Sequence, residues 1–528
     1  MHVLADRAHY RNRIAATIDS MASRAFRYAP LIVFGAVYTL SCLLGALLLI
    51  AEYKPFVALF EYFSGTAAPQ LSSEETQTSL VLLIVAPLVL AAGYAALIEL
   101  APARKRTPSK GADAQPPGWL PGTIFTALSI IGLTSLVRGG ALGRTSSWVD
   151  YGAWVQSRSE TFAQISYLEF ANLYILIPCA AAWVVVATTP RSRAQALLRW
   201  LPVPITLGLS LLLYTRKALL AALLIIVFAW IVDATTRGRP VRKFLLGGVG
   251  LVAAVYVILV VVPVYSDTST TLREASAPAA AHDPLRARRI AAAGEYFDLA
   301  NRRQAIVLYS LLSPLTRSSA PALYYPIVFP KEHDFFRLDL GLDIAGVGSM
   351  PNDNVVVWNY LNPDLPGGTT VVSYQFVLYS QIGTWGAVAA SFVVGLLLAL
   401  AWRLAQVPSR TTSSLLGAMV LLLATYLAID SLRNSVVVSY GVIWGVLFAL
   451  AAGMAVRSLP RWGLARTSLA RPPLRRAPSA SGLWSCDDSD EPSETARQEP
   501  RERPSDTTIV RRDEALVADL AERREEVV

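Results

Sequence analysis

The sequence predicts an all-α, polytopic membrane protein with about ten transmembrane helices and one large extracytoplasmic loop. Its 528 residues are 54% hydrophobic and only 16% charged, and the mean hydropathy is +0.43. A soluble protein of this composition would need an implausibly large core. Apolar segments long enough to cross roughly 30 Å of hydrocarbon also recur along most of the chain. Membrane spans, rather than a soluble core, therefore account for the composition.

Ten apolar segments are the predicted spans. They lie approximately at 30–51, 79–100, 119–137, 166–188, 200–214, 217–233, 244–264, 380–402, 412–429 and 435–456. The fifth and sixth are the hardest to separate, because Arg216 and Lys217 divide a run that would otherwise form one long helix.

The basic residues predict which loops face the cytoplasm. Arginine and lysine cluster after every second predicted span, and the positive-inside rule places such clusters on the cytoplasmic side. All clusters share one side only if the chain reverses at 215–217. Both termini are then cytoplasmic. The outward-facing loops are 138–165, 215–217, 265–379 and 430–434.

The predicted spans divide the chain into five regions. Residues 1–28 form a basic amphipathic segment, 29–264 hold helices one to seven, 265–379 form the large loop, 380–456 hold helices eight to ten, and 457–528 form a disordered cytoplasmic tail. The three cysteines have no metal-ligand or disulfide spacing. The basic residues are dispersed among the spans, which argues against nucleic-acid binding.

Several cations are expected on the outer side, where the positive-inside rule disfavours them. Arg216 and Lys217 lie at the outer mouth of the fifth and sixth spans. They either reach lipid phosphates at the interface or hold a phosphate-bearing substrate. Arg433 follows Asp430 in the short outer turn DSLRNS, where the two form a local ion pair or Arg433 contacts substrate.

The large loop contains two segments with binding potential. The first, HDPLRARRIAAAGEYFDLANRRQ, predicts a basic helix on the outer membrane surface, in which Arg302 and Arg303 face lipid headgroups or a lipid-linked pyrophosphate. The second, YYPIVFPKEHDFFRLDLG, sets aromatic residues beside polar and charged ones. Sugars bind such mixtures by stacking and hydrogen bonding. An aromatic belt at the membrane interface has a similar pattern. The charged candidates in it are Glu332, His333, Asp334 and Arg337.

Two motifs resemble the bacterial O-antigen polymerase family, the oligosaccharide repeat-unit polymerases related to the O-antigen ligases. The end of the loop has the family's Asn- and Pro/Gly-rich segment, a serine, aromatic residues and a G-x-x-G turn that enters a span. TRKALLAALL resembles the S-R-x-x-x-L-x-x-L motif, with Arg216 at the invariant basic position. The matching positions near the loop end are Asn359, Asn362, Pro366, Gly367, Gly368, Ser373, Gly383 and Gly386. The chain departs from ligase-like members at Val372, where they carry a histidine.

The resemblance implies inverting, metal-independent glycosyl transfer without a cofactor, on the outer face of a bacterial inner membrane. Donor and acceptor would be oligosaccharides on undecaprenyl pyrophosphate, and a chain-length regulator is a further implied partner. Fixed guanidinium groups can stabilise a departing pyrophosphate. The predicted catalytic residues are Arg216 and a base among Glu332, His333 and Asp334. The predicted substrate-binding residues are Lys217, Arg302, Arg303, Arg337, Asn359, Ser373 and Arg433.

Three alternatives stay open. A ligase-like enzyme would transfer the glycan to another acceptor. A polyprenyl-phosphate-sugar glycosyltransferase of the large membrane class would place an acidic pair in the first outer loop, where this chain has Glu74 and Glu75. A lipid-glycan flippase or other transporter would typically line its path with charges inside spans.

Overall fold

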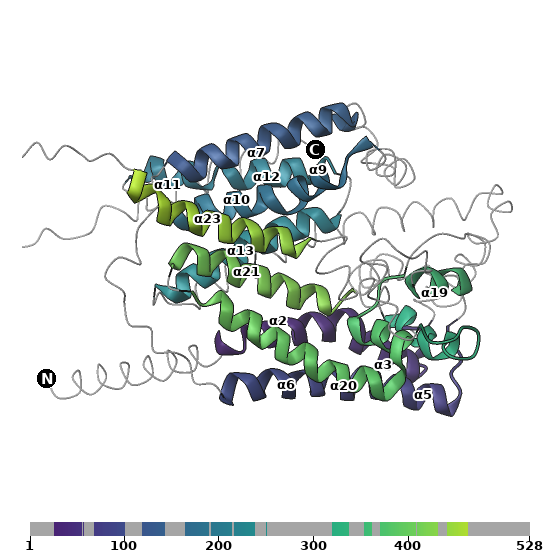
Figure 1. The fold of residues 1–528 in the computed structure, drawn as a ribbon. Coiled ribbons are helices and arrows are strands. Elements are labelled where there is room, and N and C mark those ends of the chain that lie inside the picture. Colours follow the sequence, from purple (N-terminus) through teal and green to yellow (C-terminus); the bar gives the residue numbers. More distant parts are fainter. Residues whose placement is uncertain are drawn as a thin grey trace, which may run out of the picture. The chain divides into compact units, whose positions relative to one another are not determined.

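The computed structural model describes an all-helical protein (Figure 1). The described residues are 26–54, 56–57, 68–100, 119–142, 164–188, 192–213, 216–237, 250, 319–336, 353–361, 370–407, 409–430 and 441–462. They contain no strand, and side chains are not described for Arg216 and 457–462. Seven helices of the described part are long and apolar enough to cross a membrane.

The first four spans are built as follows. The first span joins α2 (Ala29–Tyr38), η1 (Thr39–Leu43) and α3 (Leu44–Ile50), and the second joins α5 (Ser73–Leu80), η2 (Val81–Val85) and α6 (Ala86–Leu100). The third span is the single helix α7 (Trp119–Arg138). The fourth span joins α9 (Tyr167–Ala171), η4 (Asn172–Leu176) and α10 (Ile177–Ala187).

The rest of the chain contributes shorter helices and three more spans. The elements are α11 (Arg193–Trp200), α12 (Pro202–Leu211), α13 (Arg216–Thr236), a helix at 319–328, α19 (Asp353–Leu361), α20 (Tyr374–Ala405), α21 (Arg410–Leu427) and α23 (Val442–Trp462).

The described helices match most of the predicted spans and differ at two. The predicted span 200–214 contains α12, whose 10 residues rise about 15 Å, roughly half of the hydrocarbon thickness. Its neighbour α13 is a separate helix that packs against it. The last predicted span appears as the shorter apolar stretch Val442–Val456 within α23. The predicted span 244–264, and residues 1–25 and 463–528 of the predicted terminal regions, lie outside the described residues.

Polar contacts mark both ends of the bundle. At one end, which we name the loop end, Arg138 at the close of α7 pairs with Glu169 in α9, and Lys217 in α13 pairs with Asp430 after α21. At the opposite end, the Arg403 guanidinium of α20 donates to the carbonyl of Ile98 in α6, 3.0 Å away.

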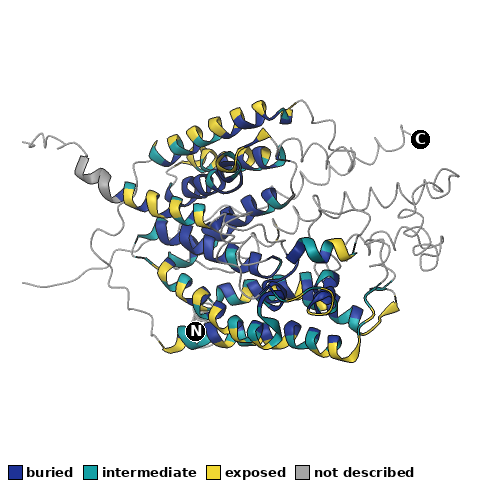
Figure 2. Ribbon diagram, turned by 45° about the vertical axis from the view of Figure 1, so that its right-hand side comes forward, coloured by how far each residue is buried: buried dark blue, intermediate teal, exposed yellow. Residues whose placement is uncertain are grey.

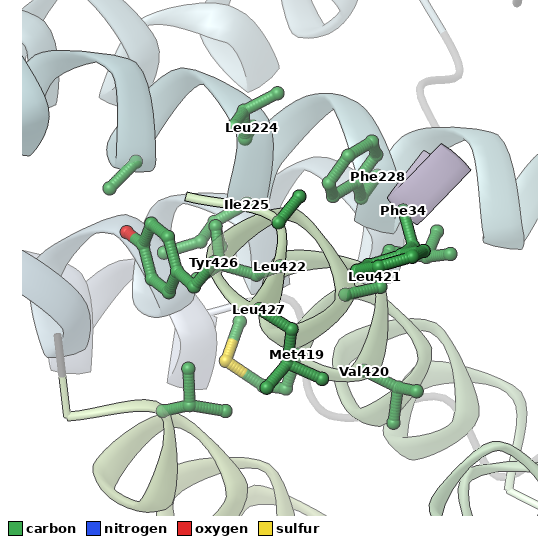
Figure 3. Close-up of a cluster of buried hydrophobic side chains, with 14 of the residues drawn as sticks. Phe34, Leu224, Ile225, Phe228, Met419, Val420, Leu421, Leu422, Tyr426 and Leu427 are labelled. Atoms are coloured by element: carbon green, nitrogen blue, oxygen red, sulfur yellow. The ribbon is translucent and has the colours of Figure 1, made fainter. Parts of the chain in front are cut away.

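The helix α21 forms the centre of the bundle. It contacts α2, α10, α13, α20 and α23, and 83% of it is buried, against 28% of α7. Figure 3 shows side chains of α2, α13 and α21 meeting at Phe34, Phe228 and Leu421. Figure 2 shows the same division, with buried residues concentrated inside the bundle and exposed ones on its outer faces. The buried hydroxyls of Ser414 and Thr425 in α21 donate to carbonyls of the same helix, so they are satisfied without water. The outer helices can expose their apolar faces to lipid.

Tyr38 links the first two spans to the start of α20. Its hydroxyl donates to the carbonyl of Leu83, 2.9 Å away in the π-helical turn η2, and accepts from the Gln375 amide at 2.9 Å. π-helical turns leave backbone carbonyls available for such contacts and are frequent at functional sites. The contacts fix the position of α20 where it enters the bundle.

The pair α6 and α20 packs with its backbones in direct approach. A Cβ atom added at Gly395 would collide with the carbonyl of Leu90, and one added at Gly93 would collide with the carbonyl of Phe392. Helices in membranes often associate through small residues in this way, because close backbone packing replaces the hydrophobic effect as the driving force.

This packing predicts that Gly395→Ala destabilises the protein. The added methyl group has no space, and overpacking of this kind costs about 1–3 kcal/mol. Thermal unfolding of purified protein, followed by tryptophan fluorescence, should give a lower midpoint. Gly35→Ala in α2 is the matched control, because a Cβ there meets nothing within 4 Å. Equal midpoints for the two variants would contradict the packing argument.

Candidate functional site

A buried polar cluster lies at the loop end of the bundle. It consists of Tyr325 on the helix 319–328, Asp353 and Asn354 at the start of α19, and Ser380 in α20. The Tyr325 hydroxyl lies 2.9 Å from Asp353 Oδ2 and 2.8 Å from Asn354 Oδ1, and Ser380 Oγ lies 3.2 Å from Asp353 Oδ2. Asp353 is only 6% exposed. Two other segments, the helix 319–328 and α20, therefore direct hydroxyl groups to the Asp353 carboxylate.

Local sequence favours the placement of Asp353. It stands in the first turn of α19, where a carboxylate interacts favourably with the helix dipole. The amide and the hydroxyl of Thr370 both donate to the carbonyl of Asn354 at 3.2 Å. These bonds hold the start of α19 close to the chain that leads into α20.

A kink at Gly383 joins the loop to α20. Gly383 has φ 73° and ψ −179°, a conformation essentially restricted to glycine, and it breaks the helical geometry there. The Phe336 amide donates to the carbonyl of Ser380 at 3.0 Å, and the Phe335 ring packs edge-on against Tyr379 with centroids 5.5 Å apart. The first glycine of the predicted G-x-x-G turn thus allows the loop to dock beside Ser380.

A second buried carboxylate, Asp430, lies at the loop end. It is 4% exposed, and its carboxylate oxygen lies 3.9 Å from Lys217 Nζ. Burial raises the pKa of Asp353 to about 6; hydrogen bonds from Tyr325 and Ser380 oppose this rise and the negative charge of Asp430 adds to it.

The helix α13 begins with two cations. Arg216 and Lys217 form its first turn, which contains no acidic residue. A helix N-terminus already carries a positive potential, so cations there are unfavourable without an anion. Asp430 supplies one negative charge to Lys217. This end of α13 has the positive charge that an anion-binding site at a helix N-terminus requires.

Glu75 and Lys331 connect the start of the second span to the large loop. Lys331 Nζ lies 2.5 Å from Glu75 Oε1, and the Ser72 amide donates to Glu75 Oε2 at 2.7 Å in a capping box. Both Glu75 oxygens are thus engaged in structural contacts, whereas Glu74 is exposed. Since α5 begins at this cap, the helix starts earlier than the predicted span at 79.

The predicted base cluster is placed as follows. Glu332 and Asp334 are exposed, and the half-buried His333 ring contacts Phe329 and Phe336 at centroid distances of 5.6 and 4.7 Å. Its Nδ1 lies 2.7 Å from the Asp334 carbonyl, which favours a proton on Nδ1 and leaves Nε2 as an acceptor. A role for His333 as base stays a prediction.

Two predicted substrate-binding residues have described side chains besides Lys217. Ser373 is fully buried, and its Oγ lies 2.6 Å from Gln375 Oε1 and 3.0 Å from the Leu427 carbonyl, so it joins the start of α20 to the end of α21. Asn359 is exposed on α19. The others, Arg302, Arg303, Arg337 and Arg433, lie outside the described residues, as does the Arg216 side chain.

Sequence reasoning missed Asp353 and Tyr325. The only local signal was the Asp-Asn pair that opens the apolar segment DNVVVWNYL. Within the described part of the chain, no group of three or more His, Cys, Asp or Glu residues has the arrangement of a metal site. No protein-family model, curated protein or solved structure matches the chain. Function must therefore be argued from the loop end itself.

The assignment of the loop end to the outer side predicts a labelling pattern. In a Cys486→Ser background, Glu332→Cys should react with an impermeant maleimide in intact spheroplasts, because Glu332 is exposed at the loop end. Arg193→Cys, exposed on α11, should react only after permeabilisation. The remaining native cysteines, Cys42 and Cys179, are buried. The reverse pattern would place the loop end in the cytoplasm.

Proposed function

We propose that the protein joins oligosaccharide repeat units carried on undecaprenyl pyrophosphate, by inverting and metal-independent glycosyl transfer on the outer face of a bacterial inner membrane. The observation that supports this most strongly is the pair of cations at the N-terminus of α13, at the loop end of an apolar helical bundle. A lipid pyrophosphate combines an apolar tail with a strongly anionic head, and it needs both features in its binding site.

The site fits the departure of a pyrophosphate. During transfer, the acceptor oxygen bonds to the anomeric carbon, the bond from that carbon to the pyrophosphate oxygen breaks, and the acceptor hydroxyl loses its proton. Negative charge grows on the leaving group. Arg216 and Lys217 are the groups proposed to stabilise that charge, without a metal.

Aromatic side chains beside the site support a sugar ligand. His333 packs against the buried rings of Phe329 and Phe336, and Phe335 packs against Tyr379, on the segment that docks onto the α20 kink. Sugar rings stack their apolar C–H faces on aromatic side chains, while nearby polar groups bind the hydroxyls. The half-buried rings of His333 and Phe335 are the proposed contacts for the glycan.

Glu75 argues against the metal-using alternative. Its engagement with Ser72 and Lys331 gives the residue a capping and ion-pairing role. Ligase-like transfer would use the same anion site with a different acceptor. The product formed, and not the geometry of the site, therefore distinguishes a ligase from a polymerase.

Deletion of the gene distinguishes these activities. Surface polysaccharide from the deletion strain, run on a gel, should show single repeat units if the protein is a polymerase. Loss of all attached glycan indicates a ligase, and loss of all extracellular glycan indicates a flippase. An unchanged ladder would overturn the proposal.

Arg216→Ala should abolish polymer when the variant complements the deletion strain. Loss of one electrostatic contact to the leaving group costs about 2–4 kcal/mol, or about two to three decades in rate. Arg216→Lys should rescue poorly, because a point charge lacks the forked geometry that grips pyrophosphate oxygens. Arg193→Ala on α11 is the control and should leave the ladder intact. A full ladder from Arg216→Ala, at equal protein level, would show that Arg216 does not act on the substrate.

A further inference from the structure

A buried ion cluster lies at the end of the bundle opposite the loop end, where α10 and α13 end and α21 begins. The Asp233 carboxylate of α13 accepts from two guanidinium groups. Arg237 Nη2 lies 2.9 Å from its Oδ2, and Arg410 Nε lies 2.7 Å from its Oδ1. Both guanidinium groups also donate to the carbonyl of Val186 in the last turn of α10, at 3.2 and 3.4 Å. We name the three charged side chains the Asp233 cluster.

The Asp233 cluster contains more positive than negative charge. Its two arginines share one carboxylate, and the Asp233 and Arg237 side chains are only 3% and 11% exposed. The C-terminus of α10 adds about half of a negative elementary charge, so the total is still positive. Because a buried charge is costly without a counter-ion, this arrangement favours an anion beside the cluster.

The adjoining parts of the sequence provide no acidic residue to neutralise this charge. Residues 188–201, 234–249 and 403–410 adjoin the cluster along the chain, and they contain several arginines but no Asp or Glu. The counter-anion is therefore expected from outside these segments.

Arg410 is the member of the cluster that a ligand can reach most easily. Its side chain is 27% exposed. Within the described part of the chain, its bonds to Asp233 and Val186 use Nε and Nη2, and thus two of the five hydrogens of a guanidinium group. These bonds occupy one edge of the planar group, and a phosphate can bind with two oxygens at the other edge.

The surroundings of the cluster are typical of a membrane interface. Trp230 precedes Asp233 by three residues on α13, and its ring packs edge-on against Trp200 of α11 with centroids 5.5 Å apart. Leu197 and Leu198 of α11 are exposed. Tryptophan rings and short helices with exposed leucines favour the boundary between headgroups and hydrocarbon. The phosphates present at this boundary belong to phospholipids, and basic sites between transmembrane helices bind anionic headgroups.

We infer that the Asp233 cluster binds the phosphate of an anionic phospholipid, with Arg410 as its main contact. The lipid phosphate supplies the missing negative charge, and the acyl chains lie along the exposed leucines of α11. This site is at the opposite end of the bundle from the first turn of α13, and it does not depend on the function proposed above.

Native mass spectrometry of the full-length protein tests the site with defined lipids. Phosphatidylglycerol is anionic, whereas phosphatidylcholine carries the same phosphate diester beside a neutralising ammonium group. Wild-type protein should bind phosphatidylglycerol more tightly. Arg410→Gln should lower that affinity by about tenfold or more, because one charge-assisted contact is lost. The variant should still fold, since Asp233 then pairs with Arg237 alone.

Arg403→Gln is the matched control. It removes the same charge from the same end of the bundle, but Arg403 donates to the carbonyl of Ile98 and is outside the cluster. This variant should keep the wild-type affinity. Equal losses in the two variants would show that the basic end attracts anionic lipid without a site, and would overturn the inference. Displacement of the lipid by excess inorganic phosphate would overturn the assignment to a lipid.

A third variant distinguishes a lipid site from a purely structural ion cluster. Asp233→Asn keeps the size of the side chain but removes its charge, so the two guanidinium groups depend more on the lipid anion. Its thermal unfolding midpoint should therefore fall further below that of wild type in phosphatidylcholine nanodiscs than in phosphatidylglycerol nanodiscs. An equal fall in the two lipids would contradict the inference, because a structural cluster has no preference between them.

Discussion

The ion pair between Lys217 and Asp430 holds a buried negative charge at the loop end, and the chemistry proposed there depends on it. The Lys217 ammonium group stabilises Asp430 as an anion. Asp353 then lies in a buried environment beside a negative charge, and its carboxylate holds a proton far more readily than a solvated one. Burying two charged carboxylates without a cation would cost free energy of folding, because both would lose their hydration. The Lys217 cation offsets part of this cost at Asp430, and hydrogen bonds from Tyr325 and Ser380 offset part of it at Asp353.

The bundle is built so that this end collects its groups from distant parts of the chain. α12 is short and α13 begins soon after it, which places two cations at a helix N-terminus. The apolar helix α21 passes through the centre and delivers Asp430 just beyond its end. The kink at Gly383 opens α20 beside Ser380, where the loop segment docks. Apolar packing sets these positions, because polar groups inside the spans would be expensive to leave unpaired.

Hydrophobic segments and special backbone positions could be predicted from the sequence, but tertiary burial could not. Most spans could be predicted from the length of the apolar segments alone, and the division of the chain at Arg216 could be predicted from the positive-inside rule. Gly383 matched a motif, and its positive φ gives the physical reason for a glycine there. Asp353 carries no such signal, because its pKa depends on burial and on Asp430, which follows it by many residues. The contact between Glu75 and Lys331 spans 256 positions and likewise has no local signature.

The central claim is that the first turn of α13 binds a lipid pyrophosphate. Native mass spectrometry of the purified full-length protein, titrated with undecaprenyl pyrophosphate and with undecaprenol, tests it most directly. We expect the pyrophosphate to bind much more tightly than the alcohol, and Arg216→Ala to remove most of this preference while Arg193→Ala keeps it. Equal binding of the two lipids by wild-type protein, or an undiminished preference in Arg216→Ala, would show that this turn does not bind the pyrophosphate.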